Sequence, residues 1–404
     1  MVNAALPGRM QASAPARNGR RPVSTKRVAF VTGEYPPTVG GVADYTRHLA
    51  HALADRGHAV SVITTSGRTR ERGDDRIEIR PVPGWGPAHL SGVRQAIREL
   101  RPDVVSFQYV PQMYGRAGVA PVASMLPTLA ARDGARVICT MHEVASPLDR
   151  RPRRLAVALA HRLQAIAVLS ACDSAIVTNA AHGRFVRALT RGRRTVHEIP
   201  AGASVLPAGD DFGSDGRGLK QALGGGAQLI GDFSPLAVGK QPRMLLALAQ
   251  TLGPGTRFVM MGGLSADDGR RAAFMRAAEA AGVAGMFVWT GPLATQDLSR
   301  HLAALDLYVH TNAAGTTGGS TTLASALAHG IATVAFRDAD TPDCFGEGGI
   351  ALVASNDTDA FAARVNGLLA APSIRARLGE EARALYSRRL AWNVIAEQVE
   401  EAMS

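Results

Sequence analysis

The run VTGEYPPTVGGVADYTRHLAHALADRGHAV, from Val31 to Val60, joins the end of one predicted strand to the start of the next through a loop and a helix. β-branched residues predict a strand over 28–32 and another over 59–64. Gly57 supplies the left-handed residue that commonly follows the end of a helix. Between the strands, apolar residues recur at helical spacing and predict one buried helix face, at Val42, Tyr45, Leu49, Ala52 and Leu53. The unit is therefore typical of parallel strands joined by a helix.

The same alternation continues outward through both halves of the chain. A parallel sheet with helices on both faces is the arrangement that strand–helix–strand alternation predicts. We therefore expect an α/β fold of two Rossmann-like doubly wound domains that face a cleft, with the chemistry just after the strands. The further predicted strands are 103–107, 136–140 and 175–178 in the first half, and 228–230, 257–261, 287–290, 307–311, 332–336 and 351–353 in the second.

Changes in composition predict the domain boundaries. Residues 1–25 are rich in Pro, Ala, Gly and Arg, with too few large apolar side chains to pack, so we expect a disordered leader. The first domain is predicted over 26–200 and the second over 227–385. A Gly- and Pro-rich linker is expected between them over 201–226, and a final helical segment over 386–404.

Composition excludes several classes of protein. The chain has 404 residues, of which 46% are hydrophobic and 20% charged, as in a globular protein. No stretch reaches the roughly 18 apolar residues of a membrane span, and no secretory signal is recognisable, so we expect a cytoplasmic protein without stable membrane insertion. The three cysteines, Cys139, Cys172 and Cys344, are too few and too far apart for a disulfide framework or a zinc site.

A net charge of +11 is typical of proteins that bind nucleic acid, but the kind of basic residue argues against such a partner. Of 45 basic residues only Lys26, Lys220 and Lys240 are lysine, which indicates a bias in genomic base composition. The arginine runs also lack the interleaved aromatic residues of single-strand binding surfaces. We predict that the protein binds no nucleic acid.

Gly40 and Gly41 end the loop that follows the first strand and stand at the start of the first helix. Backbone N–H groups at a helix start are unpaired, and glycine lets a ligand approach them closely. The loop is therefore a candidate anion site, although an ordinary turn explains it equally well from the residues alone.

The run Val31–Val60 resembles the opening of group 1 glycosyltransferases, which have the two-domain GT-B fold. The resemblance covers almost everything from 27 to about 400, with further matching segments at 103–115, 140–143, 199–202, 289–293 and 323–335. It implies a nucleoside diphosphate sugar as donor, with the glycine pair against its diphosphate. It also implies retention of the anomeric configuration and a last helix that packs back on the first domain. No divalent metal is needed if protein donors neutralise the phosphates.

The resemblance also assigns roles to individual residues. His142 takes the place of a histidine that contacts the transferred sugar, with Glu143 beside it as a candidate for contacting the acceptor; a solvated His–Glu pair is the alternative. Lys240 takes the place of a lysine on the donor phosphates. Asp232 stands where the family has an arginine, so a second cation must come from elsewhere, and Arg243 is the nearest candidate.

The sequence departs from the family after the predicted strand 307–311. The family usually has two glutamates there that hold the donor sugar and ribose, whereas Thr317 and Ser325 occupy those positions. The loop Gly315–Thr322 offers uncharged N–H and O–H donors instead, which predict a phosphate cradle; a flexible loop is the alternative. Loss of carboxylate acceptors for sugar hydroxyls favours a deoxy, amino or otherwise modified donor sugar.

The chain is thus predicted to be a glycosyltransferase for a small polar acceptor, and similar Ser/Thr/Gly loops suggest antibiotic biosynthesis with an aminoglycoside- or thiosugar-like product. The co-substrate is expected to be a UDP or GDP sugar, and a homodimer is left open. A silent nucleotide-sugar binder and a GT-B epimerase or phosphorylase are the alternatives. The predicted site residues are His142 and Glu143 for catalysis; Gly40, Gly41, Lys240, Arg243, Thr317, Gly318, Gly319, Ser320, Thr321 and Thr322 for the donor diphosphate and sugar; Leu293 and Ser325 for the nucleoside; and Gln108, Tyr109, Gln112 and Tyr114 for the acceptor.

Overall fold

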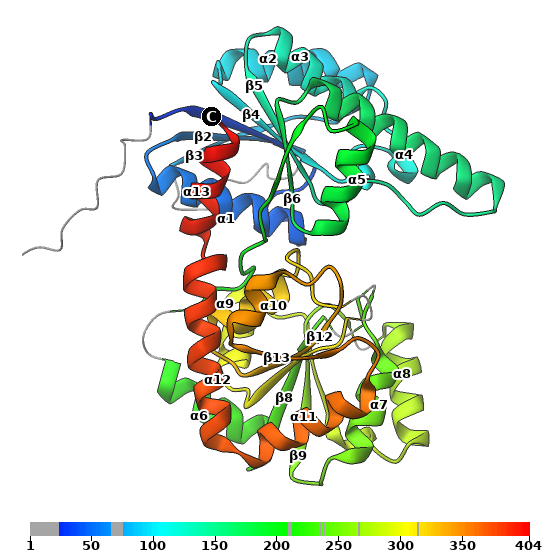
Figure 1. The fold of residues 1–404 in the computed structure, drawn as a ribbon, viewed down its shortest axis with the longest axis vertical. Coiled ribbons are helices and arrows are strands. Elements are labelled where there is room, and N and C mark those ends of the chain that lie inside the picture. Colours follow the sequence, from blue (N-terminus) through cyan, green and yellow to red (C-terminus); the bar gives the residue numbers. More distant parts are fainter. Residues whose placement is uncertain are drawn as a thin grey trace, which may run out of the picture.

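The protein consists of two α/β domains stacked along its long axis (Figure 1). The computed structural model describes residues 24–65, 76–208, 212–234, 236–237, 239–265, 267–312 and 315–404. The predicted disordered leader lies outside the described residues, apart from its last two positions.

The first domain is built on a seven-stranded sheet in the order β3-β2-β1-β4-β5-β6-β7, with every neighbouring pair parallel. Helices cover both faces, as the alternating pattern predicts. Its strands and α-helices are β1 (Arg27–Thr32), α1 (Gly41–Asp55), β2 (Ala59–Thr64), β3 (Ile77–Pro81), α2 (Leu90–Leu100), β4 (Val104–Tyr109), α3 (Leu126–Arg132), β5 (Arg136–Met141), α4 (Pro152–Ala171), β6 (Ser174–Val177), α5 (Ala180–Thr190) and β7 (Thr195–Glu198). Short 3-10 turns lie at η1 (Pro87–His89), η2 (Pro111–Met113), η3 (Arg116–Gly118) and η4 (Ala123–Met125).

The second domain has a six-stranded parallel sheet in the order β10-β9-β8-β11-β12-β13. Its strands agree with the predicted ones to within three residues at each end. Its elements are α6 (Phe212–Gly224), β8 (Gln228–Phe233), α7 (Pro242–Thr251), β9 (Thr256–Met261), α8 (Gly269–Ala280), η5 (Ala284–Met286), β10 (Phe287–Gly291), α9 (Thr295–Ala303), β11 (Leu307–His310), α10 (Thr321–Ala328), β12 (Thr333–Arg337), η6 (Asp343–Glu347), β13 (Ile350–Ala354), α11 (Thr358–Ala370) and α12 (Pro372–Leu385).

Three elements differ from the sequence prediction. The edge strands β3 and β7 were not predicted, because both are largely exposed and lack an apolar run. The linker predicted over 201–226 contains the helix α6. Its glycines favour a loop, but Leu219 and Leu223 pack against the core of the second domain, and this burial outweighs the low helix propensity of glycine.

The last helix returns to the first domain. After α12 the chain passes through η7 (Tyr386–Leu390) into α13 (Trp392–Ala402), which packs across α1 (Figure 1). Ile395, Ala396 and Val399 pack in one apolar cluster with Leu49 and Leu53 of α1. The last helix therefore packs on the first domain, as expected.

A buried carboxylate fixes α13 in this position. Glu400 accepts hydrogen bonds from Nε and Nη2 of Arg56, at 2.5 and 2.7 Å, and its Oε1 lies 3.0 Å from Nε2 of His58. Burial alone would raise the pKa of Glu400, but the hydrogen bonds to Arg56 and His58 outweigh this effect and leave the pKa below its ordinary value. The contribution of Glu400 to stability is therefore present at neutral pH and is lost as pH falls through that lowered pKa.

We predict that Glu400→Ala lowers the free energy of unfolding by about 3 kcal/mol, because it leaves Arg56 without its partner in a poorly solvated place. Urea titration at neutral pH, followed by circular dichroism, measures the change. Glu401→Ala is the matched control, since Glu401 is the exposed neighbour on the same helix and exposed substitutions cost less than about 0.5 kcal/mol. Equal stability of the two variants would contradict an anchoring role for Glu400.

Candidate functional site: an interdomain cleft

A cleft of about 770 Å3 lies between the two domains. It is reached by the loop after β1 and by the segments that follow β8, β9 and β10, so it lies at carboxyl ends of strands in both sheets. Ligand sites of doubly wound domains occupy this position. The lining residues are Pro36, Pro37, Thr38, Val39, Gly40, Gly41, Asp44, Arg47, Ser204, Val205, Phe233, Ser234, Gly262, Gly263, Pro292, Leu293, Ala294, Thr295, Leu298, Thr321 and Thr322.

Three helices begin at this cleft. Gly40 and Gly41 start α1, Ala294 and Thr295 start α9, and Thr321 starts α10; all of them line the cleft. The first N–H groups of a helix lack partners within the helix, and the helix dipole adds partial positive charge there. The cleft therefore presents three sets of N–H donors suited to an anion.

The glycine pair leaves room for a ligand at the start of α1. A Cβ atom on Gly41 would meet no other atom within 4 Å, whereas one on Gly40 would lie 2.5 Å from Oε2 of Glu34. Gly41 thus borders open space in the cleft. This geometry suits the predicted role of the pair.

Arg47 is a cleft residue that the sequence analysis missed. It lies on α1 and lines the cleft, as does Asp44 one turn earlier. The Nε atom of Arg47 is buried without a hydrogen-bond partner. Its position seven residues beyond Gly40 and three beyond Asp44 could have indicated it, because residues three and seven positions apart share a helix face. Among the described residues that line the cleft, Arg47 is the one basic side chain.

Lys240 is turned away from the cleft wall into a buried polar cluster. Its Nζ donates to Oδ1 of Asp232 at 2.8 Å, and the two side chains are 6% and 0% exposed. Thr311 donates to the other oxygen of Asp232 at 2.9 Å, and Nδ1 of His310 lies 3.4 Å from Nζ. Burial alone would lower the pKa of Lys240, but the charge of Asp232 outweighs it and raises the pKa. The lysine is therefore a cation whose charge a carboxylate already balances.

The other predicted cation, Arg243, is exposed in the first turn of α7 and does not line the cleft.

The glycines of the predicted phosphate cradle contact the first domain. The carbonyl oxygen of Gly318 accepts a hydrogen bond from the N–H of Ala201 at 2.7 Å. A Cβ on Gly318 would lie 2.5 Å from the carbonyl oxygen of Thr178, and one on Gly319 2.8 Å from the Thr178 hydroxyl. The two glycines are thus needed for close contact between domains rather than for a phosphate, and this corrects the prediction.

Of the remaining loop residues, Thr321 and Thr322 line the cleft, whereas Thr317 is half-buried outside it. Ser320 is the N-cap of α10, and its hydroxyl accepts from the N–H of Leu323 at 3.3 Å. The predicted cradle is therefore reduced to the start of α10.

Of the two residues predicted to contact the nucleoside, one lines the cleft and the other is buried elsewhere. Leu293 lines the cleft, as a residue against the base should. Ser325 is fully buried in α10, where its hydroxyl accepts from the N–H of Val205 at 3.1 Å and donates to the carbonyl of Thr321 at 2.7 Å. Ser325 therefore holds the chain that crosses between the domains, and its predicted ribose contact is corrected.

His142 follows β5 and is held by the side chain of Gln108. Its Nε2 lies 2.9 Å from Oε1 of Gln108, while the amide nitrogen of Gln108 donates to the hydroxyls of Ser106 and Thr140 at 2.9 and 3.4 Å. This network makes Oε1 an acceptor, so the proton of His142 is assigned to Nε2. Burial, together with the nearby His182, lowers the pKa of His142 to about 3. Its ring is therefore neutral at physiological pH.

Neither His142 nor the exposed Glu143 beside it lines the cleft. The ring of His142 packs edge-on against Tyr45 of α1, with centroids 4.7 Å apart. It is thus connected to the helix that begins at the glycine pair.

Three of the four predicted acceptor residues are core residues. Gln108 and Tyr109 are buried in β4. The hydroxyl of Tyr114 donates to the carbonyls of Gln108 and Val31, at 2.6 and 3.2 Å, and its ring stacks on Phe107. Only Gln112 is exposed. The aromatic residues fill the domain interior, which corrects their predicted contact with an acceptor.

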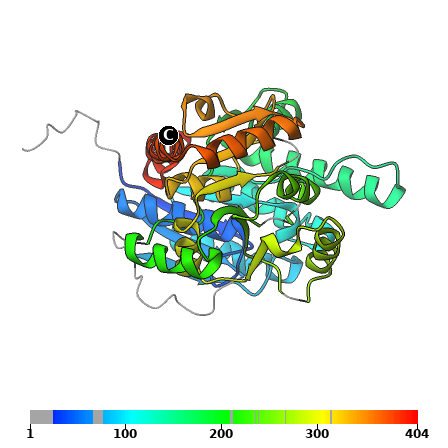
Figure 2. The same ribbon diagram turned by 90° about the horizontal axis from the view of Figure 1, so that it is seen from below.

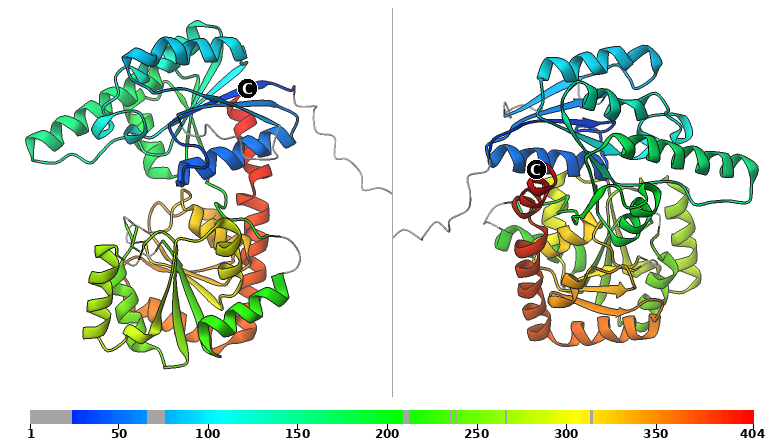
Figure 3. Two further views of the ribbon diagram at one scale, coloured as in Figure 1. Left: turned by 180° about the vertical axis from the view of Figure 1, so that it is seen from behind. Right: turned by 45° about the horizontal axis from the view of Figure 1, so that its top comes forward.

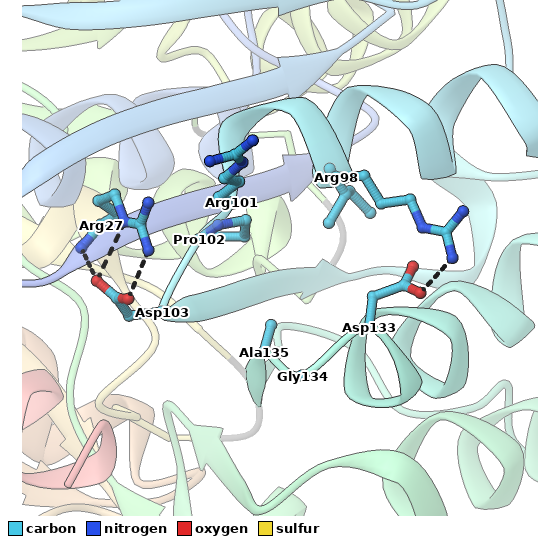
Figure 4. A pocket seen from close by; sticks show the side chains of 9 residues that line it. Arg27, Arg98, Arg101, Pro102, Asp103, Asp133, Gly134 and Ala135 are labelled. Atoms are coloured by element: carbon cyan, nitrogen blue, oxygen red, sulfur yellow. Dashed lines mark hydrogen bonds and ion pairs between the residues drawn. The ribbon is translucent and has the colours of Figure 1, made fainter.

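A second cavity, of about 430 Å3, lies at the opposite ends of the strands in the first sheet (Figure 4). Its residues precede β1, β4 and β5 or begin them, so it faces amino ends of strands. Arg27 and Asp103 pair there at 3.0 Å, and Arg98 pairs with Asp133 at 2.8 Å. Because ligands of doubly wound domains bind at the carboxyl ends of strands, the interdomain cleft is the stronger candidate site.

Comparisons with known proteins identify the family. Residues 40–202 match the family described as "Glycosyl transferase 4-like domain", and residues 230–371 match "Glycosyl transferases group 1". A 2-deoxystreptamine N-acetyl-D-glucosaminyltransferase of Streptomyces fradiae is 28% identical over 318 residues, which are 70% of this chain and 71% of that protein.

Solved structures share the fold. HepE of Anabaena in complex with UDP and glucose superposes with a TM-score of 0.70 at 16% identity, covering 93% of this chain and 98% of the other. Sucrose-phosphate synthase from Thermosynechococcus elongatus gives the same TM-score, identity and coverage. With a family match on each side of the cleft and two parallel-sheet domains of the GT-B type, the chain belongs to the group 1 glycosyltransferases, enzymes that use nucleotide sugars.

Proposed function

We propose that this enzyme transfers a sugar from a UDP sugar to an amine-bearing acceptor, with the donor diphosphate in the interdomain cleft. The observation that carries the proposal is the meeting of three helix starts and Arg47 on one cleft. N–H groups and a guanidinium are suited to the oxygens of a diphosphate. The cavity lined by Arg27, Asp103 and Asp133 does not combine these features with the carboxyl ends of both sheets.

The choice of UDP rests on related proteins. HepE is described in complex with UDP and with UDP-glucose, and the Streptomyces relative is named for N-acetyl-D-glucosamine transfer. In this chain Leu293 and the half-buried Phe233 provide apolar walls for the base at the second-domain side. A UDP-linked amino sugar also suits a site that lacks both family glutamates, because fewer carboxylates remain for hydroxyl groups.

Two carboxyl groups favour an amine-bearing acceptor on the first-domain side. Asp44 lines the cleft one turn beyond Gly41, and Glu34 lies beside Gly40. Burial raises the pKa of both groups, which means that an approaching ammonium group would stabilise their charged forms. The acceptor named for the Streptomyces relative, 2-deoxystreptamine, is an aminocyclitol with such groups.

The chemistry follows from charge and position. As the glycosidic bond to the diphosphate breaks, negative charge grows on the leaving phosphate, where the helix starts and Arg47 stabilise it. A neutral His142 with a pKa of about 3 is a weak base and does not line the cleft, so we propose that it acts through its contact with Tyr45, by positioning the helix that begins at the glycine pair. The leaving phosphate then takes the proton of the acceptor, and transfer proceeds with retention.

A thermal-shift panel of UDP, GDP, TDP, ADP and CDP tests the proposal. A ligand at a hundred times its dissociation constant adds about 2.7 kcal/mol to stability, which raises the melting temperature measurably. We expect the largest rise with UDP. A rise with another diphosphate alone would correct the base, and a flat panel would contradict the whole assignment.

Arg47→Gln should weaken UDP binding about 10- to 100-fold, because it removes a charge-assisted hydrogen bond worth about 1.5–3 kcal/mol. Isothermal titration calorimetry measures the dissociation constant. Arg243→Gln is the matched control, since Arg243 is exposed outside the cleft, and its affinity should stay at the wild-type value. The opposite pattern would identify Arg243 as the phosphate cation.

Lys240→Met should lower the free energy of unfolding by about 3–5 kcal/mol, because the charge of Asp232 then stays buried without a partner. The double variant Asp232→Asn/Lys240→Met should recover most of this loss and keep wild-type affinity for UDP. Urea titration and calorimetry provide the two readouts. A stable double variant that no longer binds UDP would show that Lys240 contacts the donor phosphates after all.

Gly41→Val should reduce UDP affinity at least about tenfold without unfolding the protein, since its side chain would enter the open cleft. Gly92→Val, in α2, is the matched control because a Cβ there also meets nothing within 4 Å. Calorimetry on both variants compares them. Wild-type affinity in Gly41→Val would show that the diphosphate does not approach this helix start.

A further inference from the structure

The helix α4 projects from the first domain beyond the body of the molecule in every view (Figures 1, 2 and 3). One of its faces packs on the domain through Ala158, His161, Ala165, Val168 and Leu169. Its first residues, 151–156, are all exposed. The outer face is therefore presented to the surroundings along the length of the helix.

This outer face carries an apolar stripe. Leu155, Leu159, Leu163 and Ile166 are 36%, 48%, 68% and 42% exposed. At 100° per residue they fall within an arc of about 80° on the helix. Leu148, in the loop before α4, is 61% exposed as well. Among the described residues, five of the ten large apolar side chains that are exposed thus belong to this one element and its preceding loop.

Positive charge flanks the stripe. The segment from Arg150 to Ala171 contains five arginines and no acidic residue. Arg150, Arg151, Arg153 and Arg154 lie together at the projecting end and are exposed. Asp149 pairs with Arg154 at 3.2 Å, which leaves the projecting end with a net positive charge.

We propose that the outer face of α4, formed by Leu155, Leu159, Leu163, Ile166 and the arginines at its start, binds an anionic lipid surface. Amphipathic helices with leucines on one side and arginines beside them lie in the headgroup region of such membranes. By length and composition alone α4 could cross a membrane, but its packed face holds it on the domain, so it lies on the surface.

Charge favours lipid over a second copy of the chain. The chain has a formal net charge of +11, so two copies repel each other while an anionic surface attracts each of them. A projecting convex ridge also fits a deformable lipid surface without a matching groove. The site lies apart from the cleft and does not depend on the proposed function.

Co-sedimentation with vesicles tests the proposal. The full chain should bind vesicles of phosphatidylcholine mixed with phosphatidylglycerol and should not bind vesicles of phosphatidylcholine alone. Leu159→Glu/Leu163→Glu should reduce binding about tenfold or more. Ile374→Glu is the matched control, because Ile374 is 47% exposed on α12, and it should bind as the wild type does. Circular dichroism checks that each variant is folded.

Two further measurements separate other causes of binding. The leader contains Arg9, Arg17, Arg20 and Arg21, and replacing all four by Gln should leave most of the vesicle binding in place. Loss of binding in that variant, or unchanged binding in Leu159→Glu/Leu163→Glu, would overturn the proposal. A concentration-dependent dimer that Leu163→Glu abolishes, seen by light scattering, would assign the stripe to a second copy instead.

Discussion

The cleft exists because the chain crosses between its two domains twice and is fastened at both crossings. At the first crossing, Ala201 donates to the carbonyl of Gly318, and Val205 donates to the hydroxyl of Ser325. At the second, Trp392 donates from Nε1 to the carbonyl of Ala203 at 2.9 Å, before α13 returns to α1. These hydrogen bonds between crossings and domains hold the carboxyl ends of two separate sheets toward each other. Without them each sheet would offer only half of a site.

The positive charge of Lys240, near the cleft, is balanced by a carboxylate. In the buried cluster, Asp232 balances Lys240, so this pair adds little net charge to the donor side. The positive groups of the cleft are then the partial charges at three helix starts and Arg47 on the opposite domain, with the carboxyl group of Asp44 one turn from Arg47. Because these groups belong to both domains, an anion between them also favours the closed arrangement. This arrangement links donor binding to the relative position of the domains.

The sequence predicted the fold well because the information for it is local. The β-branched run Val28–Thr32 predicts a strand from its own residues. The apolar stripe of α1 likewise predicts both the helix and its buried face. β3 and β7 were missed because edge strands need few apolar residues, and α6 was missed because its glycines carry the local signal while its burial is a tertiary effect.

The site was predicted less well, because a side chain after a strand can point into a cleft or into a core. Several residues that were predicted to contact the donor do line the cleft, among them Gly41, Leu293, Thr321 and Thr322. The hydroxyl of Tyr114 donates to the carbonyl of Val31 inside the domain, and Gly318 lies against Thr178 across the interface. Both contacts join residues far apart in the chain, which no local pattern reveals. Arg47 was missed for a different reason, since its helical spacing from Gly40 gains meaning only once Gly40 is known to line the cleft.

Amide hydrogen exchange with and without UDP is the sharpest test of a donor site built from helix starts, because it reports each helix start separately. We predict that UDP slows amide exchange at the starts of α1, α9 and α10 together. Exchange in the buried strand β8, beside Lys240, should keep its rate. Protection limited to a single domain, or centred on the Lys240 cluster, would contradict a diphosphate site built from helix starts of both domains.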